Sequence, residues 1–128
     1  MKTLVLDDIL ECRVPEDSIL LAANSVDVHG RFGPKSNEYI AIPEGKCYGV
    51  PYGCLVPENR ANLLVAGRCV SAESEAAGAI RVMPPCMGLG QAAGAAAALA
   101  LQTNTDVRDL DVGALRILLE KQGVLLHV

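Results

Sequence analysis

The feature that most constrains this chain is a long run of small apolar residues that begins with two adjacent prolines. From Pro84 and Pro85 to Leu101, the chain consists mainly of Ala, Gly and Leu, with seven alanines. Proline is well tolerated in the first turn of a helix, because the N–H groups there lack helical partners in any case. The run therefore predicts an Ala/Gly-rich buried helix over about 85–101.

A helix with so little side-chain bulk is expected to lie close to other backbone or to a flat ligand. Its N-terminus carries the positive end of the helix dipole and N–H groups without partners, which suit a carbonyl oxygen or an anion. Val82 to Leu101 is also long enough to suggest a membrane span. The prolines near its start, Gln91 and the lack of bulky side chains argue against a span, so no membrane contact is predicted.

The segment before this helix is predicted to contain a strand and a loop. Leu63–Ala66 is a short apolar run that stops at Gly67, which is typical of a buried strand. Cys69–Arg81 consists of small and polar residues and is predicted to be a loop. The helix would then follow directly from this loop.

Strand patterns also occur further upstream. Residues 26–29 alternate apolar and polar side chains, as a half-buried strand does. The runs 39–42 and 46–50 are strand-like and are separated by a Pro-Glu-Gly turn signal at 43–45. Together they predict a β-hairpin.

The end of the chain predicts a second helix over about 110–122. Asp106 or Asp109 is expected to cap it, and Gly123 is expected to stop it. Apolar side chains recur along one face of this segment. Short strands in the first half and two helices in the last third predict a mixed α+β fold.

Composition and charge exclude some classes of partner. Half of the residues are hydrophobic, so a core can form, although the chain has no Trp and a single Phe. The formal net charge is −4 and no basic stripe is visible. Nucleic acid is therefore not expected as a partner.

Five cysteines are spread through the chain, an odd number without paired spacing. The first residues, Met1–Asp8, are too short and too acidic for a secretory signal, so reduced thiols in a cytoplasmic protein are expected. Zinc would need a CxxC-type pair, and none is present. No metal is expected, and four of the thiols are interpreted as small buried hydrophobes: Cys47, Cys54, Cys69 and Cys86.

Three stretches of the chain resemble the C-terminal part of FAD-dependent oxidoreductases. They are YGVPYGCLVP (48–57), LLVAGRCVSA (63–72) and EAAGAIRVMPPCMGLGQAAGAAAA (75–98). Their order and spacing fit the glutathione-reductase-type flavin fold, in a branch that resembles fumarate reductase and tricarballylate dehydrogenase. The combination of GR, RVMP and GQAAG is specific, and the resemblance extends from about Ile9 to about Val124.

The resemblance also implies a domain organisation. Residues 1–57 would form part of a substrate-side domain with connecting strands, and residues 58–128 the C-terminal part of an FAD-binding domain. Such enzymes open with a GxGxxG strand–turn–helix that holds the ADP half of FAD. No GxGxxG follows a strand here, because Gly88, Gly90 and Gly94 have a different spacing inside a helix. FAD is therefore not expected to bind this chain alone, and a separate GxGxxG flavin-domain chain is one expected partner.

The resemblance assigns the flavin contacts to two segments. Gly67 would allow close backbone approach to the ribityl chain or pyrophosphate, with Arg68 as a fork of donors. The first turn of the Pro84 helix would stabilise negative charge on the reduced ring. The alternatives are a strand-ending glycine with a surface arginine, and a helix that only packs on a sheet. The expected cofactor-binding residues of the helix are Pro84, Cys86, Met87, Gly88 and Gly90.

Two residues are candidates for the catalytic site. Arg81 would lie near the flavin or a substrate carboxylate; alternatively it forms a surface salt bridge to Glu73 or Glu75, which would contribute little. His29 titrates near neutral pH, and the family often has a histidine here. A lone histidine after an alternating strand is otherwise an ordinary half-exposed residue.

The chain departs from the family pattern at two positions. Many relatives carry Arg where this chain has Gly53, and many carry His where it has Ser74. Both replacements remove a group able to bind or protonate a substrate. They affect the expected substrate chemistry more than the flavin contacts, because the GR loop and the Pro84 helix are intact.

Three functions are consistent with these patterns. The first is hydride transfer between FAD and a small substrate, expected to be a carboxylate. The second is a non-catalytic assembly module, in which the exposed apolar face of the Ala/Gly-rich helix drives formation of a dimer or larger oligomer. The third, a small metal-binding protein, would require bound zinc, and none is expected.

Overall fold

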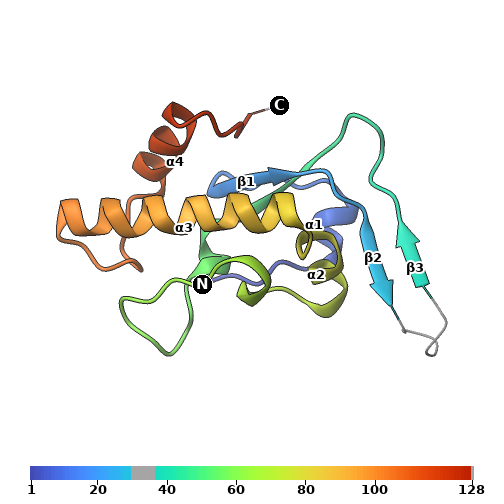
Figure 1. The fold of residues 1–128 in the computed structure, drawn as a ribbon, viewed down its shortest axis with the longest axis horizontal. Coiled ribbons are helices and arrows are strands. Elements are labelled where there is room, and N and C mark those ends of the chain that lie inside the picture. Colours follow the sequence, from blue (N-terminus) through green and yellow to red (C-terminus); the bar gives the residue numbers. More distant parts are fainter. Residues whose placement is uncertain (30–36, 128) are drawn as a thin grey trace.

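The computed structural model describes residues 1–29 and 37–127 and has the mixed α+β fold that the sequence predicts. Figure 1 shows the long helix α3 crossing the molecule, with the hairpin β2–β3 at one end. The elements in this part of the chain are α1 (Leu6–Leu10), β1 (Ser18–Ala22), β2 (Val26–His29), β3 (Asn37–Ile40), β4 (Tyr48–Pro51), the 3₁₀ turns η1 (Tyr52–Leu55) and η2 (Gly67–Cys69), α2 (Ser74–Ile80), α3 (Met83–Thr103) and α4 (Val112–Lys121).

The Ala/Gly-rich helix α3 forms where it was predicted. It extends two residues further at each end, from Met83 to Thr103, with the prolines in its first turn. It ends at Asn104, which has a left-handed φ of 52°. Across residues 1–29 and 37–127, no helix has the length and hydropathy needed to cross a membrane.

Helix α3 is buried on one face and exposed on the other. A Cβ added to Gly88 would lie 2.6 Å from Cδ1 of Leu20 on β1, so the two elements approach closely there. At Gly90 and Gly94 an added Cβ would have no atom within 4 Å. The small side chains thus permit close packing on one side and leave a bare apolar surface on the other. The buried face consists of Pro85, Leu89, Ala92, Ala95, Ala96 and Ala100.

The strand pairs differ from the predicted hairpin. The turn at Pro43–Gly45 does form, since the Lys46 N–H donates to the Pro43 carbonyl at 3.0 Å. However, β4 pairs antiparallel with β1, and β3 pairs antiparallel with β2. All four residues of β4 are buried, so its place is decided by the core and not by the adjacent turn.

Two predictions for the segment before α3 are also wrong. Leu63–Ala66 is not a strand: within the described parts of the chain, its backbone has a single ladder-like bond, from the Val65 N–H to the Leu55 carbonyl at 2.8 Å. The predicted loop at 69–81 contains α2. The small residues of α2 let the helix lie directly on the β2 backbone. Their composition is also typical of a loop, so the sequence did not reveal this packing.

Helix α4 is confirmed, but its cap is neither of the predicted residues. The Asp111 carboxylate accepts from the Ala114 N–H at 3.1 Å, as an N-cap does. Asp106 instead accepts from the Arg108 N–H at 2.9 Å, in the preceding turn. Gly123 follows the helix with a φ of 88°, a conformation in which glycine is favoured.

Side chains that donate to backbone carbonyls hold the irregular segments together. The buried Tyr52 hydroxyl donates to the Val107 carbonyl at 2.7 Å. The Arg108 guanidinium donates to three carbonyls of the 57–60 loop, at 2.6–3.2 Å. Arg116 donates to the Ser18 carbonyl. Residues on both sides of Pro57 join one hydrophobic cluster, and the assignment of 1–57 and 58–128 to two domains stays a prediction.

The contact between α2 and β2 gives a test of the fold. Replacement of Gly78 by Ala would place a Cβ 2.7 Å from the Asp27 carbonyl oxygen, which is backbone and cannot rotate away. Gly78→Ala is expected to lower the free energy of unfolding by about 1–3 kcal/mol in urea denaturation. The matched control Gly94→Ala faces open space and is expected to gain up to about 1 kcal/mol from helix propensity. Equal effects of the two variants would contradict this packing.

Tyr52 gives a test in alkaline solution. Burial, assisted by the charge of Asp106, raises the pKa of Tyr52 to about 12, and burial also raises the pKa of Tyr48. A tyrosine of the unfolded chain titrates near 10, so the stabilisation is present below that pH and is lost as the pH rises towards 12. Tyr52→Phe is expected to cost about 1 kcal/mol at neutral pH. The difference from the unmodified chain should shrink above pH 10; a constant difference in urea midpoints would disprove the assignment.

Candidate functional site

The Gly67–Arg68 loop lies against the first turn of α3. Gly67 begins η2 with a φ of 64°, a left-handed conformation that glycine adopts without strain. A Cβ at this position would lie 3.9 Å from both Cβ and Sγ of Cys86. The structure therefore brings together the two segments that the sequence assigned to one site.

The N-terminus of α3 presents fewer donors than expected. Pro84 and Pro85 have no N–H, and the Cys86 N–H donates to the Val82 carbonyl at 3.2 Å. Among residues 1–29 and 37–127, the N–H groups of Val82 and Met83 have no acceptor. Both residues are exposed, so the positive end of the helix reaches solvent through two N–H groups.

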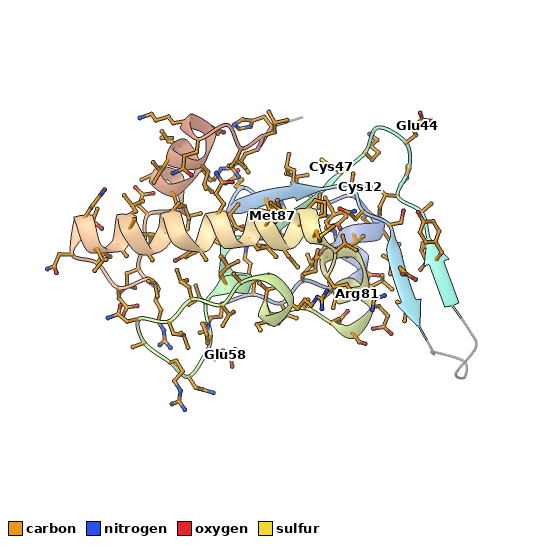
Figure 2. The ribbon with its side chains drawn as sticks, in the orientation of Figure 1. Cys12, Glu44, Cys47, Glu58, Arg81 and Met87 are labelled. Carbon is orange, nitrogen blue, oxygen red and sulfur yellow. The ribbon has the colours of Figure 1, made fainter. Side chains whose placement is uncertain are left out.

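Arg81 is held by β2 and not by Glu73 or Glu75. Its Nη2 donates to the Asp27 carbonyl at 3.0 Å and lies 3.3 Å from the Asp27 carboxylate. Figure 2 shows Arg81 at the end of α2, on the side of β2. The two side chains are 40% and 42% exposed, so solvent screens the pair.

Arg68 lies beside Arg81 but is bound differently. Its Nε–H donates to the Arg81 carbonyl at 3.2 Å, which holds the guanidinium end of the side chain against the turn before α3. Over the described ranges, its guanidinium makes no ion pair. Arg68 is thus the cation at this site that retains donors for an added anion.

A small cavity of about 210 Å³ separates η2 from α2. Gly67, Arg68 and Arg81 line it together with apolar side chains of α2 and the segment before it. A liquid water occupies about 30 Å³, so this space corresponds to about seven waters or one small organic group. Apolar side chains and two arginines therefore line the same cavity.

The remaining predicted residues of the helix fall into two groups. Pro84, Met87 and Gly90 are exposed on the outer side of α3. Gly88 instead faces Leu20 of β1, so the absence of a side chain there serves packing. Cys86 is half-buried, and its S–H donates to the Ile80 carbonyl at 3.5 Å.

His29 ends strand β2, but its side chain lies outside the described residues. Asp27, two residues earlier, is a site residue that sequence reasoning missed. The available signal was its polar position in the alternating run Val26–His29, which marks the side of the strand that faces away from the core. Within the described part of the chain, no group of three or more His, Cys, Asp or Glu residues could hold a metal ion.

The two arginines differ in their expected contribution to stability. Arg81→Gln removes a hydrogen bond and an ion pair to Asp27 and is expected to lower the free energy of unfolding by about 1 kcal/mol. Arg68→Gln removes a surface contact and should cost less than about 0.5 kcal/mol. Urea denaturation of both variants measures this, and a larger loss for Arg68→Gln would show that Arg68 is primarily structural.

Comparison with known proteins extends this picture. A search of curated proteins and a search of solved structures each found no match. The family described as FAD dependent oxidoreductase matches residues 1–119, which is most of the chain. The match includes the Gly67–Arg68 loop, the α3 N-terminus and the strands that support them. The chain therefore belongs to the FAD dependent oxidoreductase family.

Proposed function

We propose that this chain supplies the isoalloxazine and ribityl side of an FAD site, and that a second chain with a GxGxxG motif supplies the ADP side. The observation that carries the proposal is the solvent-facing N-terminus of α3, which lies directly beside the Gly67–Arg68 loop. This pairing puts two N–H donors, the helix dipole and an arginine at one edge of the molecule.

The size of the site supports the need for a second chain. The cavity beside Gly67 and Arg68 measures about 210 Å³, which is too small for a dinucleotide. A flat ring can instead lie across the exposed first turn of α3, against Met83 and Met87, which are 78% and 74% exposed. FAD would then be enclosed only when another surface covers it.

When FAD is bound, its ring accepts or delivers the hydride in this family's reaction class. In the proposal, the N–H groups of Val82 and Met83 stabilise negative charge at the edge of the ring. Arg68 holds the ribityl chain or pyrophosphate, and Arg81, oriented by Asp27, faces the carboxylate of a small substrate. A proton-handling role for His29 is part of the same proposal.

A stripe on α3 is a suitable docking surface for the second chain. We call it the outer stripe: its members are exposed, apolar or without a side chain, and spaced alternately four and three residues apart. This spacing keeps them on one side of the helix, as at a helix–helix interface. The outer stripe consists of Met83, Met87, Gly90, Gly94, Ala97 and Leu101.

A flavin titration tests the proposal. The purified chain alone is expected to leave the visible absorption spectrum of FAD unchanged. Addition of a protein that carries a GxGxxG flavin domain is expected to shift the spectrum, and Arg68→Gln should weaken this binding about tenfold or more through loss of a charged hydrogen bond. A flat titration with both chains present would remove the flavin function from this chain.

The outer stripe can be tested separately from the flavin. Ala97→Lys and Leu101→Lys lie on the part of the outer stripe far from the proposed ring contact, and each is expected to abolish association with the second chain while the variant alone keeps its circular dichroism and urea midpoint. The control Leu125→Lys changes a side chain that is 81% exposed, comparable with 84% at Leu101. Loss of association with Leu125→Lys as well would indicate a non-specific charge effect.

A second candidate function is favoured by the same outer stripe. An exposed apolar surface of this kind also suits a second copy of the chain, which would make the protein a self-associating module without flavin chemistry. Light scattering at high concentration distinguishes the two: a monomer that binds the GxGxxG chain supports the first, and a dimer or larger oligomer disrupted by Met87→Lys supports the second.

A further inference from the structure

Two of the five cysteines, Cys12 and Cys47, line one cavity that is separate from the candidate site. The cavity measures about 460 Å³ and lies between the segment after α1 and the segment before β4. Cys12 and Cys47 both border it, and Lys46 lies on the same rim. Figure 2 labels both cysteines. They are free thiols and partly exposed.

The backbone brings these two cysteines abreast. The chain reverses between Pro15 and Ser18, where the Ser18 N–H donates to the Pro15 carbonyl at 3.0 Å. Because β1 runs antiparallel to β4, the segment before this turn runs in the same direction as β4. The Gly49 N–H donates to the Arg13 carbonyl at 2.8 Å, so the two segments lie side by side, joined by a backbone hydrogen bond. Cys12 precedes Arg13 by one residue, and Cys47 precedes Gly49 by two.

The other features of the pair favour reaction over burial. Cys12 has a φ of 53°, a left-handed conformation that is uncommon for residues other than glycine. Cys54 is the contrasting case, since it is fully buried and its burial raises the pKa of the thiol to about 11. A thiol of that kind stays protonated and inert, whereas partly exposed thiols are open to oxidants.

We propose that Cys12 and Cys47 form an intramolecular disulfide when the chain meets a hydroperoxide. One thiolate attacks the peroxide oxygen, which gives a sulfenic acid and releases an alcohol, or water from hydrogen peroxide. The second thiolate attacks the sulfenic sulfur, the S–S bond forms, and water leaves. Two thiols are oxidised by two electrons, and the peroxide is reduced.

The link would close a loop that contains residues 13–46, and thus β1, β2 and β3. A covalent loop restricts the unfolded chain, so the oxidised protein is expected to unfold at a temperature higher by roughly 10 °C. Because β2 carries Asp27, the link also restrains the hairpin that holds Arg81. The inference depends on the cysteines alone and not on flavin binding.

Thiol mapping of the full chain tests the proposal. The reduced protein is treated with hydrogen peroxide, remaining thiols are blocked with N-ethylmaleimide, and the intact mass is measured. The expected product has lost two hydrogen atoms and two alkylation sites. Trypsin leaves Cys47 and Cys54 on one peptide, so the Cys54→Ser variant assigns the link between peptides 3–13 and 47–60.

Substitutions supply the controls. Cys12→Ser and Cys47→Ser are each expected to abolish the link and the shift in unfolding temperature, whereas Cys86→Ser keeps both. Circular dichroism of each reduced variant verifies that it folds. The proposal is overturned if the native chain gives the same mixture of pairs as the urea-unfolded chain, if a different pair predominates, or if the thiols oxidise singly without a cross-link.

Discussion

The structure depends on the close approach of helix α3 to β1. Each described sheet has only two strands, and an isolated pair of strands is marginal in water. The pair β1–β4 is stabilised because α3 covers it, and α3 can cover it because glycine and alanine let the helix approach to within contact of Leu20. The same rule applies at the smaller scale of α2, where Gly78 lies on the backbone of β2. In both places, surface is buried because small residues let two elements approach closely, and not because large side chains fill the space between them.

Side-chain hydrogen bonds hold the irregular segments that lie outside the two sheets. The segments 57–62 and 104–111 are both irregular and are joined by side-chain hydrogen bonds. Arg108, in the second segment, donates to backbone carbonyls in the first. Tyr52 does the same from the core to Val107. The bond from Tyr52 is buried, and a buried carbonyl without a partner is costly, so this bond helps to determine where the segment around Val107 can lie. The bonds from Arg108 are exposed and add contacts between the two segments.

This construction has a consequence for the candidate site. The packed face of α3 is committed to the core, which leaves its N-terminus and outer stripe to solvent. The Gly67–Arg68 loop is fixed beside that N-terminus by the bond from Arg68 to the Arg81 carbonyl. Asp27 holds Arg81 in turn, so strand β2, far away in sequence, orients the turn from which α3 begins. The arrangement of the candidate site therefore depends on packing between segments that are far apart in the sequence.

The sequence by itself determined the features that depend on neighbouring residues. Pro84 and Pro85 predicted the start of α3, Gly123 the end of α4, and the alternation at 26–29 a strand, because each reflects local backbone preference. The family resemblance carried the grouping of Gly67, Arg68 and the helix. Only the tertiary structure decided that β4 pairs with β1, that Asp111 caps α4, and that Asp27 binds Arg81. It also decided that Leu63–Ala66 finds no strand partner among residues 1–29 and 37–127. Those outcomes depend on which distant surfaces are buried together, and a turn, an apolar run or a lone carboxylate is compatible with several such partners.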